Sequence, residues 1–222
     1  RLGEPKAAAA RLRTARRPAA AHPADPARAR AARRAERIVE KSRYYEVARQ
    51  FGALVGAAPE LPGGGRLAIV TGGGPGLMEA ANRGAFEARG TSVGLNITLP
   101  HEQFPNPYVT PDLCLRFHYF AIRKLHFLLR ARALVAFPGG FGTMDELFEV
   151  LTLAQTRKIE PLPIILVGEE FWRRAFDVEF LVEEGVIDPE DRNLFWYAES
   201  AEEIWGDILY WRQKAGRPLA GR

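Results

Sequence analysis

Short apolar runs and helical stripes alternate along this 222-residue chain. The apolar runs predict strands at residues 67–71, 92–97, 133–137 and 164–167, with a further short strand at 195–197. Spacings of three and four between apolar residues predict helices at 77–89, 117–132, 143–157, 170–184 and 200–214. Strands that alternate with helices predict an α/β fold, built as a doubly wound, Rossmann-like parallel sheet.

The first 43 residues differ in composition from the rest. They hold 13 basic and 4 acidic residues, a net charge of +9, whereas residues 44–222 carry a net charge of −5. Pro18, Pro23 and Pro26 interrupt the helical pattern, and Asp25 before Pro26 is typical of a helix start. One long helix, or two in succession, should then reach about Val55. We predict a basic helical arm at 1–43 and a single Rossmann-like domain at 44–222.

Several classes of partner and site are not expected. No aromatic residues lie between the arginines of the arm, so we predict a solvated arm and no nucleic-acid partner. No apolar run approaches the ~20 residues that span a bilayer, and the single cysteine, Cys114, predicts a buried free thiol in a reducing compartment. We expect a cytoplasmic protein without a membrane partner. The four histidines lack metal-ligand spacing, so no metal is expected.

Two glycine-rich turns follow predicted strands and open into predicted helices. One is Gly72-Gly73-Gly74-Pro75-Gly76, and the other begins at Pro138-Gly139-Gly140-Phe141-Gly142. Such turns bring backbone N–H groups and a helix N-terminus close to a ligand, so a phosphate is the expected ligand. Neither turn matches a P-loop or the dinucleotide-binding pattern, which argues against an ordinary ATPase or NAD enzyme.

The motifs Gly-Gly-Gly-Pro-Gly-Leu-Met-Glu-Ala (72–80) and Pro-Gly-Gly-Phe-Gly-Thr-Met-Asp-Glu (138–146) resemble the LOG family of cytokinin riboside 5′-monophosphate phosphoribohydrolases. The resemblance runs from about Tyr44 to about Trp211, and residues 99–108 are similar to the longer members. Those members have a first strand ending in Gly-Ser-Ala-Arg. Arg1 could be that arginine, so a first strand is expected to be missing here.

The resemblance implies an N-glycosidase that acts on a nucleoside 5′-monophosphate, AMP or N6-substituted AMP, without a cofactor. It assigns catalysis to Glu146 and Arg123, and it implies a homodimer or an assembly of dimers. The substrate-binding residues it implies are Gly73, Gly74, Met78, Glu79, Glu102, Lys124, Gly139, Gly140, Gly142, Thr143 and Thr152. The alternative is a nucleotide-binding protein of the same fold that does not turn its ligand over.

The residues themselves allow other interpretations. Thr143 and Glu146 have the spacing of a capping box, as do Ser200 and Glu203, for which capping is the whole expectation. Arg123 also belongs to a seven-residue repeat of arginines that is typical of a solvated helix face. A decarboxylase would need pyridoxal phosphate on a lysine, and Lys124 is the only well-placed candidate of the five lysines.

Overall fold

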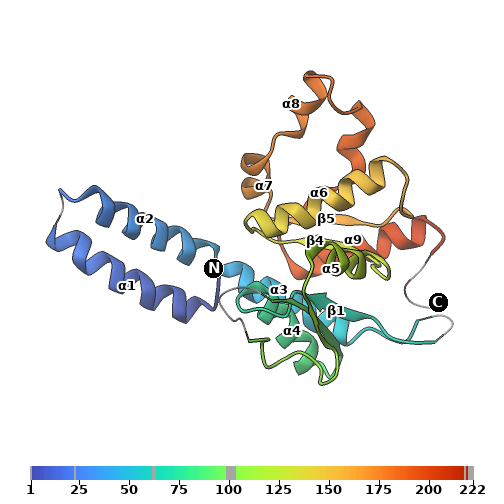
Figure 1. Cartoon of the computed structure of the whole chain (residues 1–222), viewed down its shortest axis with the longest axis horizontal. Coiled ribbons are helices and arrows are strands. Elements are labelled where there is room, and N and C mark those ends of the chain that lie inside the picture. The colour runs from blue at the N-terminus through green and yellow to red at the C-terminus, as the bar shows by residue number, and fades with distance from the viewer. Residues whose placement is uncertain (1, 23, 62–63, 99–103, 218, 220–222) are drawn as a thin grey trace. The chain divides into compact units, whose positions relative to one another are not determined.

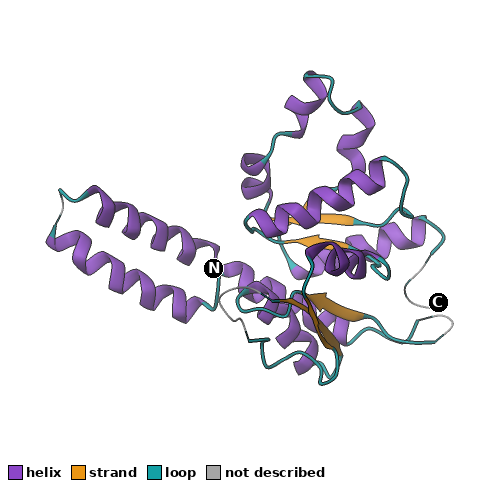
Figure 2. Cartoon of the chain, in the orientation of Figure 1, coloured by secondary structure: helices purple, strands orange, loops and turns teal. Residues whose placement is uncertain are grey.

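The protein is described by a computed structural model that covers residues 2–22, 24–61, 64–98, 104–217 and 219. The chain divides into two compact units. Unit 1 comprises Arg1–Ala57 and Leu67–Arg116, and unit 2 comprises Ala58–Arg66 and Phe117–Arg222. Figure 1 labels the α-helices and some of the strands, and Figure 2 distinguishes helices, strands and loops by colour. The predicted boundary at residue 43 lies within unit 1 and stays a prediction.

The N-terminal segment forms helices α1 (Pro5–Ala21) and α2 (Pro26–Lys41), which run antiparallel and side by side (Figure 1). The predicted cap is confirmed, because the Asp25 carboxylate accepts hydrogen bonds from the N–H groups of Ala27 and Arg28. Pro18 does not end its helix. It lies in the last turns of α1, where a missing backbone donor removes only one hydrogen bond.

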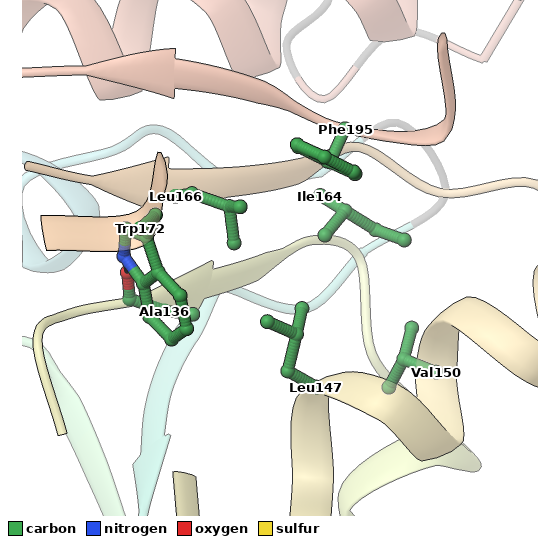
Figure 3. Close-up of a cluster of buried hydrophobic side chains, with 7 residues drawn as sticks. All are labelled: Ala136, Leu147, Val150, Ile164, Leu166, Trp172 and Phe195. Carbon is green, nitrogen blue, oxygen red and sulfur yellow. Dashed lines mark hydrogen bonds between the residues drawn. The ribbon is translucent and has the colours of Figure 1, made fainter. Parts of the chain in front are cut away.

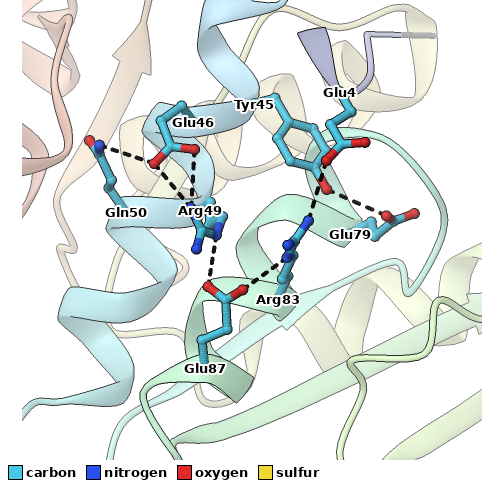
Figure 4. Close-up of polar contacts among 8 residues, drawn as sticks. All are labelled: Glu4, Tyr45, Glu46, Arg49, Gln50, Glu79, Arg83 and Glu87. Carbon is cyan, nitrogen blue, oxygen red and sulfur yellow. Dashed lines mark hydrogen bonds and ion pairs between the residues drawn. The ribbon is translucent and has the colours of Figure 1, made fainter. Parts of the chain in front are cut away.

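Helix α3 (Arg43–Gly56) follows α2 almost directly, so the prediction of two helices in succession is confirmed. It packs against α4 (Leu77–Glu87) so closely that a side chain on Gly52 would collide with the carbonyl of Ala81. The approach is close from the other side as well, because a side chain on Gly84 of α4 would collide with the carbonyl of Arg49 on α3. Figure 4 shows the polar rim of this interface, where Arg49 and Arg83 both bind the carboxylate of Glu87.

The sheet of unit 1 has the order β1-β2-β3. Strand β1 (Ala68–Thr71) pairs in parallel with β2 (Thr91–Ile97), and β3 (Cys114–Phe117) lies beyond β2. The first two strands match the prediction, but β3 was missed: only its last residue, Phe117, lay in a predicted element, the helix at 117–132. Cys114 is exposed on β3, so the expectation of a buried thiol was wrong.

The sheet of unit 2 has the order β4-β5-β6, and all of its strands are parallel. They are β4 (Leu134–Ala136), β5 (Ile164–Val167) and β6 (Trp196–Ala198), as the apolar runs predicted. The α/β class with parallel sheets of the Rossmann type is therefore confirmed. The strands are distributed over two three-stranded sheets, one for each unit.

Helices surround this second sheet. They are α5 (Phe120–Leu128), α6 (Phe141–Gln155), α7 (Glu169–Ala175), α8 (Val178–Glu183) and α9 (Ala201–Lys214), with a 3₁₀ helix at Pro189–Leu194. Figure 3 shows Leu147 of α6 packed with Ile164 and Leu166 of β5. Trp172 of α7 is wholly buried there, and its indole N–H donates to the carbonyls of Ala136 and Val167. This core holds α6, the helix that carries Glu146, against the sheet.

Helix α5 is shorter than predicted, and the predicted helix at 170–184 is split into α7 and α8 by a break at Phe176 and Asp177. Asp177 caps α8 through its carboxylate, which explains the new start. The box at Ser200 and Glu203 forms at the start of α9 as predicted. Among the described residues, no helix has both the length and the apolar character needed to cross a membrane.

Candidate functional site

Arg123 and Glu146 form an ion pair within unit 2. Arg123 Nη2 lies 2.8 Å from Glu146 Oε1, and the two side chains are only 12% and 21% exposed. The guanidinium also lies over the rings of Phe120 and Phe127, at 5.1 and 5.5 Å from their centroids. Arg123 is thus not part of a solvated stripe. Its Nε is buried and has no hydrogen-bond partner among the described residues.

The capping-box interpretation of Glu146 is excluded by where α6 begins. The N-cap is Gly140, and Thr143 already lies in the first turn, with its N–H bonded to the carbonyl of Gly140. The helix was predicted to begin at Thr143, but it begins at Phe141. Glu146 therefore lies beyond the reach of the N-cap, and its carboxylate bonds to Arg123 instead.

Burial raises the pKa of Glu146 above its usual range, while the charges of Arg123 and Lys124 act in the opposite direction. The carboxylate is thus held by a cation yet binds a proton more readily than a free carboxylate does. Such a group is better suited than a free carboxylate to accept a proton from water.

Lys124 is occupied by two carboxylates of α6. Its Nζ lies 2.7 Å from Asp145 Oδ1 and 3.6 Å from Glu149 Oε2. The hydrogen bond that Lys124 donates to Asp145 is the main reason that the pKa of Lys124 is raised, which keeps the ammonium charged. Asp145 and Glu149 were missed from the sequence, although their separation of four residues places them on one face of the helix.

An open hollow of about 450 Å³ adjoins this ion-pair cluster. It is lined by Lys124, Asp145, Phe148, Glu149, Thr152 and Leu153. The structure thus brings two predicted binding residues, Lys124 and Thr152, to one hollow beside the catalytic candidates. The Thr152 hydroxyl donates to the carbonyl of Phe148 at 2.7 Å, so its lone pairs stay available to a ligand.

The second glycine turn lies at the N-terminus of α6. A side chain on Gly139 would collide with Thr143, whereas Gly140 and Gly142 face open space. The N-cap has no side-chain hydrogen bond, and the N–H groups of Thr143 and Met144 bond to the carbonyl of Gly140, so the N–H groups of Phe141 and Gly142 remain for a ligand. Phe141 lies between them and is 93% exposed. An apolar ring this exposed beside a polar site was not anticipated.

The first glycine turn lies in unit 1, between β1 and α4. Gly73 has a φ of 68° and Gly76, the N-cap of α4, a φ of 86°, so both positions need glycine. Met78 and Glu79 lie in the first turn of α4. Glu79 accepts a long hydrogen bond of 3.4 Å from the hydroxyl of Tyr45 on α3, as Figure 4 shows. Glu102 lies outside the described residues.

The structure places the predicted residues in two groups. Arg123, Lys124, Glu146, Thr152 and the second turn belong to unit 2, and the first turn with Met78 and Glu79 belongs to unit 1. Among the described residues, no group of three or more His, Cys, Asp or Glu side chains is arranged to hold a metal ion.

Solved structures share this fold. One is an X-ray structure of TM1055, with 23% identity, a TM-score of 0.51, and coverage of 76% of this chain and 88% of that one. Another is a Moco carrier protein from Chlamydomonas reinhardtii, with 21% identity, a TM-score of 0.51, and coverage of 78% and 89%. At these identities the likeness concerns the fold alone.

Curated relatives come from plants. Cytokinin riboside 5′-monophosphate phosphoribohydrolase LOG1 of Arabidopsis thaliana is 37% identical over 84 residues, which is 37% of this chain and 39% of LOG1. The probable phosphoribohydrolase LOGL3 of Oryza sativa subsp. japonica is 27% identical over 164 residues, 68% of this chain and 72% of LOGL3. LOG5 of Arabidopsis thaliana is 29% identical over 143 residues, 63% of this chain and 61% of LOG5. The chain therefore spans less than two thirds of the length of LOG1 and LOG5.

A family profile described as "Possible lysine decarboxylase" matches residues 78–208, more than half of the chain. This range includes Arg123, Glu146 and the whole second glycine turn, and it also includes the start of α4 after the first turn. The chain belongs to this family, which is the LOG family.

Proposed function

We propose that this protein hydrolyses the N-glycosidic bond of a nucleoside 5′-monophosphate, AMP or N6-substituted AMP, and releases the free base and ribose 5-phosphate. The observation that carries the proposal is the half-buried Glu146 carboxylate, held 2.8 Å from Arg123 on a helix that begins with an uncapped glycine turn. The names of the plant relatives support the same reaction class.

The carboxylate has a defined use in this reaction. As the bond from C1′ to the base nitrogen breaks, its electrons leave with the base and positive charge develops on the ribose. Glu146 stabilises this charge and accepts a proton from the water whose oxygen bonds to C1′. That proton, or one from solvent, is transferred to the base nitrogen that was bonded to C1′, which gives the neutral free base. Burial, which raises the pKa of Glu146, makes it a better acceptor than a free carboxylate.

Arg123 has two uses in the same proposal. It holds the Glu146 carboxylate in place, and its unpaired Nε leaves it a donor for the leaving base or another acceptor of the substrate. Two aromatic rings restrict its motion. We propose that Gly139, Gly140, Gly142 and Thr143 bind the phosphate, because the N–H groups at the start of α6 are uncapped.

The remaining substrate contacts stay proposals of the same kind. Lys124 and Thr152 line the hollow beside Glu146 and are proposed to contact the nucleotide there. Gly73, Gly74, Met78 and Glu79 are proposed to bind it through the first glycine turn.

A lysine decarboxylase fits the site less well, despite the description of the family. Pyridoxal phosphate would need a lysine amine that loses its proton readily, to form an imine. Lys124 is instead bound by Asp145 and Glu149, and its pKa is raised. The residues do not fit that cofactor, and we propose no cofactor.

A second copy of the chain is the proposed partner, and the cytoplasm the proposed location. Helix α5 has no buried residue, and Phe120, Ile122 and Leu125 are each about half exposed. Apolar side chains this exposed are typical of a protein interface. A homodimer that buries them would also restrict the motion of Arg123, which lies on the same helix.

The test is base release from a panel of nucleoside monophosphates, followed by chromatography. Release of adenine from AMP, with ribose 5-phosphate in equal amount, is expected. Calorimetric binding of AMP without any release would favour the non-catalytic nucleotide-binding alternative. Release from adenosine at the same rate as from AMP would contradict the monophosphate specificity.

A further inference from the structure

Asn82 is a wholly buried side chain that joins three segments of unit 1. Its Oδ1 accepts hydrogen bonds from the hydroxyl of Thr71 at 2.7 Å and from Nδ2 of Asn106 at 2.9 Å. Its Nδ2 donates to the hydroxyl of Ser92 at 2.8 Å. These partners lie at the end of β1, in the segment after β2 and on β2. A buried amide with every group paired at these distances fixes the geometry of all three segments.

The same partners hold the backbone of the first glycine turn. The Thr71 hydroxyl accepts the N–H of Gly73 at 2.9 Å. Asn106 donates from its backbone N–H to the carbonyl of Gly73 at 2.8 Å, and from Nδ2 to the carbonyl of Gly74 at 3.1 Å. Three hydrogen bonds therefore fix two glycines through residues that converge on Asn82.

A run of three glycines needs such restraint. Glycine has the largest conformational freedom of any residue, so an unrestrained turn would lose binding energy each time it ordered around a ligand. Gly73 is also confined on its other side, because an added Cβ there would lie 3.2 Å from the Cα of Gly94. The turn is thus prepared before any ligand arrives.

Ser92, the third partner of Asn82, bonds to a segment other than the glycine turn. The Ser92 hydroxyl donates to the carbonyl of Tyr108 at 3.0 Å, and the Ser92 N–H donates to the Thr110 hydroxyl at 3.0 Å. These bonds tie the segment after β2 to the sheet, and neither reaches the glycine turn. Ser92 bonds to Asn82 and has no direct hydrogen bond to the turn among the described residues, so it provides a wholly buried control whose hold on the turn is indirect.

We propose that Thr71, Asn82 and Asn106 are positioning residues, which hold the first glycine turn in the conformation that binds the nucleotide. This inference rests on the proposed function, which assigns the turn to nucleotide binding. Thr71 acts through the N–H of Gly73, Asn106 through the carbonyls of Gly73 and Gly74, and Asn82 by fixing both of these side chains.

The test compares Thr71→Val, Thr71→Ser and Ser92→Ala in the full chain. Valine has the shape of threonine but lacks the hydroxyl, and serine restores it. We expect Thr71→Val to weaken AMP binding by calorimetry about tenfold or more, and to raise KM with kcat within about twofold, since the turn binds ground state and transition state alike. Amide exchange at residues 72–76 of the free protein should also become faster. Thr71→Ser should restore all three properties.

Ser92→Ala should lower the melting temperature, but it should change AMP affinity and amide exchange at residues 72–76 much less than Thr71→Val does, because Ser92 acts on the turn through Asn82. Wild-type affinity or wild-type exchange in Thr71→Val would overturn the inference, as would an equal loss of AMP affinity in Ser92→Ala. AMP binding without base release would overturn the proposed hydrolysis alone. A wild-type protein that does not bind AMP would overturn both.

Discussion

Replacing Glu146 by glutamine separates the charge of this residue from its shape. Glutamine keeps an oxygen that can accept the 2.8 Å hydrogen bond from Arg123, so the local packing should survive. A unit charge that develops about 4 Å from a carboxylate is stabilised by about 4 kcal/mol at an effective dielectric constant of about 20. Arg123 offsets part of this field. We therefore expect Glu146→Gln to cost about 3 kcal/mol of transition-state stabilisation, roughly a hundredfold or more in kcat.

The assay is adenine release from AMP, followed by chromatography, with AMP affinity and melting temperature measured on the same preparation. Affinity should stay within a few-fold of wild type. Glu203→Gln is the matched control, because Glu203 belongs to a capping box that forms at Ser200, and glutamine preserves such a box. The control should keep wild-type turnover. Wild-type turnover in Glu146→Gln would refute the catalytic role and return Glu146 to a structural one.

Four further outcomes can be checked. Burial raises the pKa of Glu146 above the usual 4.5, so activity that needs the carboxylate should fall as the pH is lowered through that raised pKa; a kcat/KM profile whose acid limb lies at or below 4.5 would contradict this. AMP should bind at least about a hundredfold more tightly than adenosine in calorimetry, since a charged phosphate site loses several kcal/mol without its phosphate, and equal affinities would disprove the phosphate site. Trp172→Ala should destabilise the protein by about 3–5 kcal/mol in urea unfolding, because it empties a wholly buried position and removes the indole hydrogen bonds to the carbonyls of Ala136 and Val167; a change below about 1 kcal/mol would mean that the core tolerates the cavity. Light scattering at micromolar concentration should give at least twice the 24.7 kDa of one chain, and a monomer would argue against the proposed dimer.

Local sequence features were sufficient for most of the fold. Of the six strands among the described residues, five lie at apolar runs, and the caps at Asp25 and Ser200 form as their residue types predict. These strands and caps depend on interactions between residues a few positions apart, so their positions can be predicted from the local sequence. The missed strand β3 is only four residues long, and such a short run gives too little apolar pattern to identify a strand without its pairing partner.

The role of Glu146 could not be predicted from the residues next to it in the sequence. The spacing of Thr143 and Glu146 suits a capping box, and only the start of α6 at Phe141 excludes it. Gly142 has low helix propensity, yet it lies in the first turn because packing of Leu147 and Val150 against β5 determines where α6 lies.

The α/β class and the two glycine turns could be predicted from the order of residues along the chain. Three contacts could not: the ion pair of Glu146 with Arg123, 23 residues away, the neutralisation of Lys124 by Asp145 and Glu149, and the bonds by which Asn82 joins Thr71 to Asn106. The physical reason is that a pKa, an ion pair or a buried hydrogen bond depends on distance and solvent exclusion. Those quantities arise only when segments far apart in the chain pack together.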